Sequence, residues 1–206
     1  KGGLGDDVFV ANLNDGQDTV DGEEGKNTID YSNLGNTHHI DVNLANDDNT
    51  TTVSVDDVVE DTISHIQNVI GTAGNDEITG NDDVNTLEGG DGVDKLVGGK
   101  NNDHLYGGSG NDSFVGGADD DFLYGGVRNV DGSHTDIGTE DVVDYSASLG
   151  SVTADFETNS ATGAAIGNDT FDGIENIIGS NFDDTFKSSL TTDNDFNGKS
   201  QTEDGY

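Results

Sequence analysis

The chain has 206 residues, of which 43 are Asp or Glu and only 7 are Lys or Arg, so its formal net charge is -36 at pH 7. Gly contributes 31 residues, Pro, Cys, Met and Trp are absent, and hydrophobic residues make up 30%, well below the share in ordinary globular domains. The absence of Cys excludes disulfides and thiolate sites, the charge argues against a nucleic-acid partner, and no apolar stretch is long enough for a membrane span.

Residues 1–30 form a first block of nine-residue repeats, and the sixth place in each repeat is the informative one. The copies are Gly2–Val10, Leu13–Asp21 and Gly22–Asp30, with Asp7, Asp18 and Asn27 at that place. Because the repeat is already under way at Gly2, we expect the chain to be a segment of a longer protein.

Residues 31–70 interrupt the repeats with a longer segment. It starts Asp30-Tyr31-Ser32, and the alternation of Ile40, Val42 and Leu44 is typical of a half-buried strand. The segment ends in DTISHIQNVIGTAGND over residues 61–76. We interpret it as a β-rich insertion that widens one coil and continues into the next repeats.

Residues 71–126 contain six nonapeptides in unbroken register: GTAGNDEIT, GNDDVNTLE, GGDGVDKLV, GGKNNDHLY, GGSGNDSFV and GGADDDFLY. Position 6 holds Asp76, Asn85, Asp94, Asp103, Asp112 and Asp121. Position 8 holds Ile78, Leu87, Leu96, Leu105, Phe114 and Leu123. The Gly, Asn and Asp of positions 1–6 favour tight turns, and positions 7–9 favour a three-residue strand.

One large apolar residue in nine can be buried only in a narrow interior shared between copies. Two turns and two strands close one coil of 18 residues, so alternate repeats line two facing walls of parallel strands. We expect Ile78, Leu96 and Phe114 on one wall. Leu87, Leu105 and Leu123 should face them.

Residues 127–178 hold a second insertion with the plan of the first. Residues 127–136 lack periodicity and predict a loop. The segment then reads Asp144-Tyr145-Ser146, and its last part, DTFDGIENIIGSNFDD over residues 169–184, resembles the end of the first insertion. Residues 179–206 comprise one more repeat, Gly179–Lys187, and a tail in which we expect no strand.

A core this thin cannot offset the ordering entropy of the chain, and stacked coils bring carboxylates together. Something cationic must join the structure. Calcium accepts six to eight oxygen ligands from carboxylates and carbonyls in flexible geometry, whereas magnesium prefers a tight octahedron and keeps its waters. The sequence therefore predicts calcium ions as cofactors.

The nonapeptide resembles the G-G-x-G-x-D-x-U-x repeat of the RTX (repeats-in-toxin) family, with clean copies at Gly2–Val10, Gly89–Val97 and Gly107–Val115. The resemblance implies an all-β fold, a right-handed parallel β-roll or β-solenoid, here with two β-rich insertions. It also implies calcium between same-side turns and export by the type I secretion machinery.

The resemblance further implies a ligand pattern. Each ion is held by the carbonyls of positions 2 and 4 and the Asp of position 6 in one turn, together with positions 1, 3 and 6 of the turn 18 residues later. Three sites follow: Thr72, Gly74 and Asp76 with Gly89, Asp91 and Asp94; Gly90, Gly92 and Asp94 with Gly107, Ser109 and Asp112; and Gly99, Asn101 and Asp103 with Gly116, Ala118 and Asp121. Asp7 and Asp18 are further candidates, whereas Asn27 and Asn85 lack the carboxylate, so the first block is expected to bind few ions.

Catalysis has little support in the sequence. The adjacent His38 and His39 lack a recurring partner, and Ser32 and Ser146 follow Tyr at equivalent places without a paired His. Runs of acids are expected in so acidic a chain. We therefore expect no enzyme and no catalytic residues.

Two functions remain open. The first is a calcium-binding domain that folds outside the cell and supports the secretion and stability of a larger extracellular or cell-surface bacterial adhesin or toxin. The alternative is a calcium-dependent domain that binds a glycan or another surface partner, because positions 7 and 9 of alternate repeats place Tyr106, Phe122 and Tyr124 on one outer face.

Overall fold

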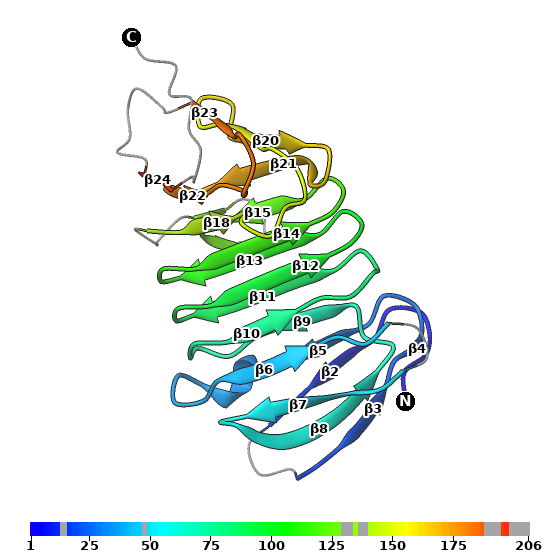
Figure 1. Cartoon of the computed structure of the whole chain (residues 1–206). Coiled ribbons are helices and arrows are strands. Elements are labelled where there is room, and N and C mark those ends of the chain that lie inside the picture. The colour runs from blue at the N-terminus through cyan, green and yellow to red at the C-terminus, as the bar shows by residue number, and fades with distance from the viewer. Residues whose placement is uncertain (13–15, 47–48, 129–133, 136–139, 188–194, 198–206) are drawn as a thin grey trace.

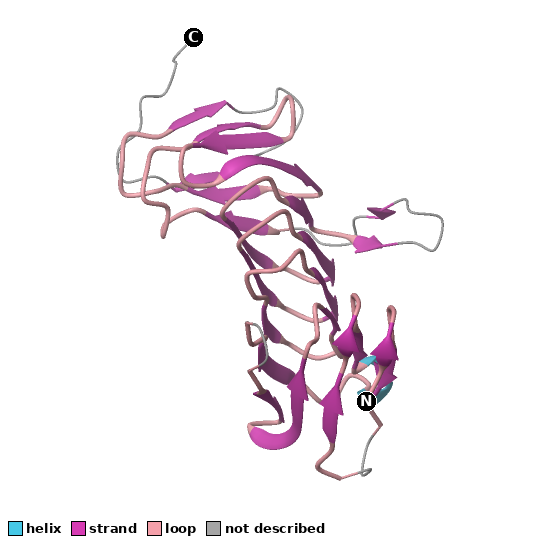
Figure 2. Ribbon diagram, turned by 90° about the vertical axis from the view of Figure 1, so that its right-hand side faces the viewer, coloured by secondary structure: helices cyan, strands magenta, loops and turns pink. Residues whose placement is uncertain are grey.

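The computed structural model describes residues 1–12, 16–46, 49–128, 134–135, 140–187 and 195–197, and the fold account is confined to them. The chain is all-β apart from one 3-10 turn, η1 (Ser32–Leu34). Two sheets, each of 10 strands, form an elongated stack along which the chain advances (Figure 1). Figure 2 shows the turns crossing between the sheets like rungs.

The first sheet has the strand order β24-β22-β18-β14-β12-β10-β6-β7-β8-β3. Its strands in chain order are β3 (Thr19–Asp21), β6 (Ile40–Asn43), β7 (Thr51–Val55), β8 (Val58–Ser64), β10 (Glu77–Thr79), β12 (Lys95–Gly99), β14 (Ser113–Gly117), β18 (Val142–Asp144), β22 (Asn176–Ile178) and β24 (Asp195–Asn197).

The second sheet has the order β2-β5-β9-β11-β13-β15-β21-β20-β19-β23. Its strands are β2 (Val8–Val10), β5 (Thr28–Asp30), β9 (Asn68–Ile70), β11 (Thr86–Asp91), β13 (His104–Ser109), β15 (Phe122–Tyr124), β19 (Thr153–Asp155), β20 (Ser160–Gly163), β21 (Gly167–Asp172) and β23 (Thr185–Lys187). Two short pairs accompany the sheets: β1 (Gly3–Leu4) with β4 (Glu23–Glu24), and β16 (Val127–Arg128) with β17 (His134–Thr135).

The six central repeats alternate between the sheets as predicted. In the first sheet the parallel register aligns Ile78 with Leu96 and Leu96 with Phe114. In the second sheet Leu87, Leu105 and Leu123 are aligned in the same way. All six side chains have an exposed fraction of 0%, so the predicted interior is confirmed. Glu77 and Lys95 form a cross-strand ion pair on the outside of the first sheet.

The two insertions are antiparallel three-stranded units that join the sheets. In the first, β6, β7 and β8 pair antiparallel, and in the second β19, β20 and β21 do the same. Asp56 and Asp57 turn β7 into β8, and their positive φ angles of 51° and 64° suit a two-residue hairpin loop. Parallel pairing resumes beside each unit, between β6 and β10 and between β15 and β21.

Two local expectations were wrong. Residues 127–136 were expected to form a loop, but β16 and β17 pair antiparallel, with Val127 opposite Thr135 and Arg128 opposite His134. The tail was expected to lack strands, but β24 continues the first sheet beside β22. Both errors have one cause: backbone pairing requires a free sheet edge or a facing segment, and a short strand needs no apolar alternation to use it.

No helix in the described ranges has the length and apolar character that crossing a membrane requires.

Candidate metal centre

The position-6 side chains form two columns along the stack, one on each side. In the first column, Asp94 Oδ1 accepts the backbone N–H of Asp76 at 2.8 Å, and Asp112 Oδ1 accepts that of Asp94 at 2.8 Å. In the second, Asp103 Oδ1 accepts the N–H of Asn85 at 2.8 Å, and Asp121 Oδ1 accepts that of Asp103 at 2.9 Å. One oxygen of each carboxylate thus fixes the spacing between successive same-side turns.

The other oxygen of these carboxylates has no donor in the protein. Oδ2 is buried without a hydrogen-bond partner in the four central aspartates, which are Asp94, Asp103, Asp112 and Asp121. Their side chains are at most 2% exposed. A buried carboxylate oxygen left unsatisfied costs about 1–3 kcal/mol or more, so four in register require a cation.

The raised pKa values of the column aspartates also indicate that their ionised form is costly in the folded chain. Burial raises the pKa of Asp94 to about 8, and repulsion from Asp112 and Asp76 adds to it. Burial also raises the pKa of Asp121 to about 8, that of Asp103 to about 7 and that of Asp112 to about 6. A protonated carboxyl or a bound cation relieves the same cost, so protons and metal ions compete for these sites.

Backbone carbonyl oxygens lie near the orphaned carboxylate oxygens of Asp94 and Asp103. A Cβ at Gly89 would lie 2.2 Å from Asp94 Oδ2 and 2.7 Å from the carbonyl oxygen of Gly107, so both oxygens border the space beside Gly89. A Cβ at Gly110 would lie 1.5 Å from the carbonyl oxygen of Gly92, and the φ of Gly110 is +135°. Only glycine fits there, and the turns can therefore bring carbonyls close together.

The donor set suits calcium. Among the described residues, no group of three or more His, Asp or Glu side chains could hold a metal ion alone. The candidate sites instead combine a carboxylate column with backbone carbonyls, a mixture that calcium accepts in flexible geometry. The buried orphaned oxygens and the glycine-lined turns therefore fit calcium.

The structure brings together most of the residues predicted for the second and third sites. Gly92 N–H donates to the carbonyl of Ser109 at 2.7 Å, and Ala118 N–H donates to that of Gly99 at 3.0 Å. Gly116 lies beside Asp121 Oδ2, as Gly107 lies beside Asp112 Oδ2. Asp91 and Asn101 are exposed, so only their backbone can serve a site within the column.

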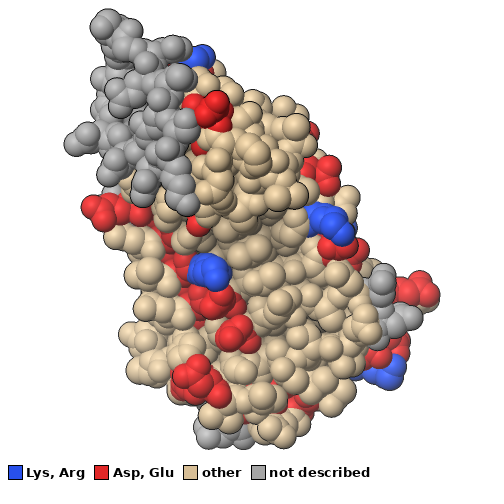
Figure 3. Space-filling view, viewed as in Figure 1, with Lys and Arg blue, Asp and Glu red and all other residues tan. Residues whose placement is uncertain are grey.

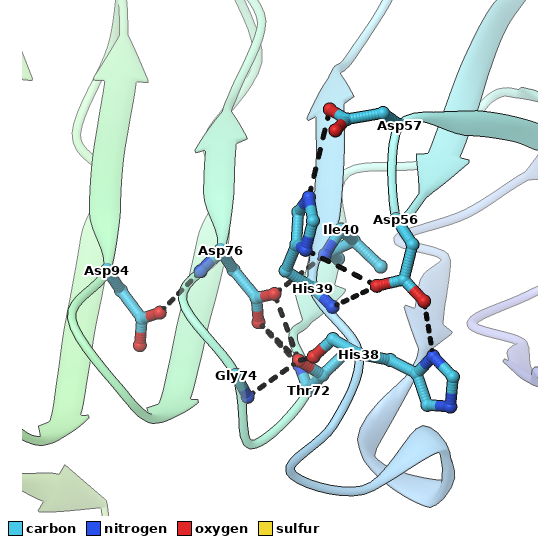
Figure 4. A network of polar contacts seen from close by, with 9 residues as sticks. All are labelled: His38, His39, Ile40, Asp56, Asp57, Thr72, Gly74, Asp76 and Asp94. Carbon is cyan, nitrogen blue, oxygen red and sulfur yellow. Dashed lines mark hydrogen bonds and ion pairs between the residues drawn. The ribbon is translucent and has the colours of Figure 1, made fainter.

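The predicted first site differs from the others because a hydroxyl is already present (Figure 4). Asp76 Oδ2 accepts the Thr72 N–H at 2.6 Å, and Asp76 Oδ1 accepts the N–H of Ile40 at 2.7 Å. The Thr72 hydroxyl lies 3.0 Å from Asp76 Oδ1 and 2.7 Å from the carbonyl oxygen of His38. Thr72 occupies position 2, which is Gly in the clean repeats, and backbone N–H groups satisfy both oxygens of Asp76 within the protein.

The asparagines at position 6 have hydrogen-bond partners within the protein. Asn85 is 0% exposed, and its Nδ2 donates to the carbonyl of Gln67 at 2.8 Å. Asn27 is likewise 0% exposed, and its Nδ2 donates to the carbonyl of His65 at 3.0 Å. An amide N–H group that donates to a backbone carbonyl thus stands in the place of the second carboxylate oxygen. No unsatisfied oxygen remains at these turns, which gives a physical reason to expect few ions there.

The first block offers one strong candidate and one weak one. Asp7 Oδ2 is buried without a partner, and a Cβ at Gly2 would lie 2.2 Å from it. Asp18 is exposed, and its backbone N–H donates to Asp61 Oδ1 at 3.0 Å. Asp18 therefore lacks the buried environment of the central aspartates.

Three further aspartates extend the columns across the insertions, and sequence reasoning named none of them as a ligand. Asp141 Oδ1 accepts the N–H of Asp112 at 2.6 Å, Asp169 Oδ1 accepts that of Asp121 at 3.1 Å, and Asp61 has the same relation to Asp18. Asp141 stands at position 6 of a further copy of the nonapeptide, residues 136–144, whereas the sequence distances from Asp18 to Asp61 and from Asp121 to Asp169 are not multiples of nine, so the period hides these two. The shared Asp-Thr dipeptide at the end of both insertions is the signal that could have identified Asp61 and Asp169.

The basic side chains lie on the outer surface, away from the buried carboxylate columns. Figure 3 shows one face, on which the few basic side chains (Lys or Arg) lie beside acidic ones. Lys95 pairs with Glu77 and Lys100 with Asp82, and all four side chains are about half exposed. Such exposed pairs contribute little to stability, so they cannot neutralise the buried columns.

Comparison with known proteins matches the chain to the family described as RTX calcium-binding nonapeptide repeat (4 copies), over residues 1–33, 66–96 and 97–127. No curated protein matches the chain. The matched ranges include both columns from Asp76 to Asp121 and stop short of Asp141 and Asp169.

Proposed function

The chain carries RTX repeats, whose ions are calcium, and we propose that it is a calcium-binding domain that folds as a right-handed parallel β-roll outside the cell. The observation that carries this proposal is the set of buried Oδ2 atoms without a donor at Asp94, Asp103, Asp112 and Asp121. Four uncompensated carboxylates in register make the folded state depend on a cation.

The proposal assigns the ions to the turns. Asp94 and Asp112 hold one ion together with carbonyls of Gly90, Gly92, Gly107 and Ser109. Asp103 and Asp121 hold another with carbonyls of Gly99, Asn101, Gly116 and Ala118. The predicted first site joins Thr72, Gly74 and Asp76 to Gly89, Asp91 and Asp94, and it is the weakest because both Asp76 oxygens already have backbone donors. Asp7 holds a further ion in the first block.

The role that follows is support for a larger secreted protein, either an adhesin or a toxin. A chain that needs calcium to fold stays extended where free calcium is low and can be threaded through the type I secretion machinery. It then folds where calcium is at millimolar concentration, in the range where extracellular modules bind with Kd of about 10⁻⁴–10⁻³ M. The bacterial cell surface or the surrounding medium is the proposed location.

Equilibrium dialysis against calcium, with magnesium as the competing ion, tests the calcium assignment. We expect several calcium ions per chain at millimolar calcium, retained in excess magnesium. Asp103→Asn should bind fewer ions yet still fold, because Asn85 and Asn27 show that the column accepts asparagine. Equal binding of both metals, or unchanged stoichiometry in Asp103→Asn, would contradict the proposal.

A further inference from the structure

Two buried tyrosines occupy equivalent places in the two insertions. Tyr31 and Tyr145 each follow an aspartate and precede a serine, and their exposed fractions are 0% and 3%. The Tyr31 hydroxyl donates to Asp61 Oδ2 at 2.8 Å, and the Tyr145 hydroxyl donates to Asp169 Oδ2 at 2.9 Å. The same contact has thus been built twice, between residues that are 30 and 24 positions apart.

The two acceptors are built like the column aspartates. Asp169 Oδ1 accepts the N–H of Asp121 at 3.1 Å, as Asp121 Oδ1 accepts that of Asp103 at 2.9 Å. Asp61 Oδ1 accepts the N–H of Asp18 at 3.0 Å. The difference is confined to the second oxygen, which has no donor at Asp121 and a tyrosine hydroxyl at Asp61 and Asp169.

A hydroxyl donor removes the need of a buried carboxylate for a cation. The O–H group satisfies the oxygen and places an aromatic ring in the apolar core, where a hydrated ion would find no further ligands. Burial raises the pKa of Tyr145 well above its ordinary value, so its hydroxyl keeps the donated proton.

We propose that Tyr31 and Tyr145 replace a cation at Asp61 and Asp169, so that these two carboxylates bind no calcium. This inference rests on the proposed function, because it assumes that the repeats bind calcium. The tyrosines are positioning residues that leave neither of these two carboxylates with an unsatisfied second oxygen.

The number of bound ions in two matched variants tests the inference. Asp121→Asn and Asp169→Asn each replace one buried column carboxylate by an amide that keeps the Oδ1 acceptor. At saturating calcium, equilibrium dialysis should show about one ion or more lost from Asp121→Asn and none from Asp169→Asn. Loss of calcium from Asp169→Asn to the same extent as from Asp121→Asn would overturn the inference.

A double-mutant cycle tests the hydroxyl–carboxylate contact without counting ions. Tyr145→Phe should lower the urea midpoint of unfolding because Asp169 Oδ2 loses its donor, and the loss should be smaller when Asp169 is already Asn. Tyr124→Phe, which removes a hydroxyl from the outer face, is the control. Equal losses in both backgrounds would contradict the inference.

The two experiments separate failure of the inference from failure of the proposed function. A wild-type chain that binds no calcium in dialysis would refute the proposed function, and with it the idea that the hydroxyl replaces a cation. The cycle would still report whether Tyr145 and Asp169 are coupled. A wild-type chain that binds calcium and loses it in Asp169→Asn would refute the inference alone.

Discussion

Each central aspartate divides its two oxygens between two tasks. Oδ1 holds the backbone of the turn 18 residues earlier, while Oδ2 lies buried without a donor. Asparagine can perform the first task and not the second, because an amide carries no charge to bind a cation. Substitution by asparagine therefore tests metal binding with little change to the backbone contacts.

Asp94 and Asp76 provide the sharpest comparison. The proposed sites use Asp94 twice and Asp76 once, and Thr72 already donates to Asp76. Asp94→Asn should raise the calcium concentration at the folding midpoint on the order of ten-fold, and Asp76→Asn by much less. Calcium titrations followed by circular dichroism measure both midpoints. Equal shifts would mean that the assumed sharing of Asp94 is wrong.

The raised pKa values predict how pH acts on the metal-free chain. Asp94 and Asp121, with pKa values of about 8, bind more protons when folded than when unfolded at any pH between about 4 and 8. The stability of the metal-free fold is therefore greatest below the unfolded pKa and is lost as pH rises through the folded pKa. Far-UV circular dichroism of the calcium-free protein should show more β structure at pH 5 than at pH 8.

Calcium should reverse that trend, because binding requires the ionised carboxylates and releases protons. The calcium midpoint should fall as pH rises from 6 to 8, through the pKa values of Asp112, Asp103 and Asp94. A calcium midpoint that is the same at both pH values would show that these carboxylates are not the ligands.

At the scale of elements, the outer face of β11, β13 and β15 carries two ring stacks. His104 stacks on Phe122 at 4.7 Å between centroids, and Tyr106 stacks on Tyr124 at 4.9 Å. Arg128 of β16 lies 5.4 Å from the Tyr106 ring and pairs with Glu88 at 2.9 Å. Tyr106 is only 8% exposed, so this strand covers part of the face.

These contacts predict a structural role for the stacked tyrosines. The double variant Tyr106→Ala and Tyr124→Ala should lower the free energy of unfolding by about 2 kcal/mol or more. It should leave the number of bound calcium ions unchanged, because the ligands lie in the turns. Leu149→Ala, at a side chain that is 86% exposed, is the control for an unrelated surface truncation. Unaltered stability combined with lost glycan binding would favour a ligand face instead.

The central repeats could be predicted from the sequence because their fixed nine-residue period allows only one register of the strands. Once Ile78 pairs with Leu96, the 18-residue coil fixes which residues face inward and which carbonyls meet. Asp61 and Asp169 could not be found in this way, because an insertion separates each from the preceding turn of its column. Their place depends on hydrogen bonds to Asp18 and Asp121, which no local pattern encodes.

At the scale of the whole molecule, a thin apolar interior must be reconciled with a large negative charge. Its interior takes one large apolar side chain from each central repeat, while its net charge is -36. The columns of buried carboxylates turn that charge into a requirement for cations within the central repeats. At Asp61 and Asp169 in the insertions, tyrosine hydroxyls supply donors instead.

Far-UV circular dichroism of the chain, first in excess chelator and then with rising calcium, tests the central claim most directly. We predict that β structure is largely lost in chelator and returns cooperatively as calcium reaches millimolar concentration, while magnesium at equal concentration fails to restore it. Full β structure in excess chelator at neutral pH would contradict the claim that buried, uncompensated carboxylates make folding depend on calcium.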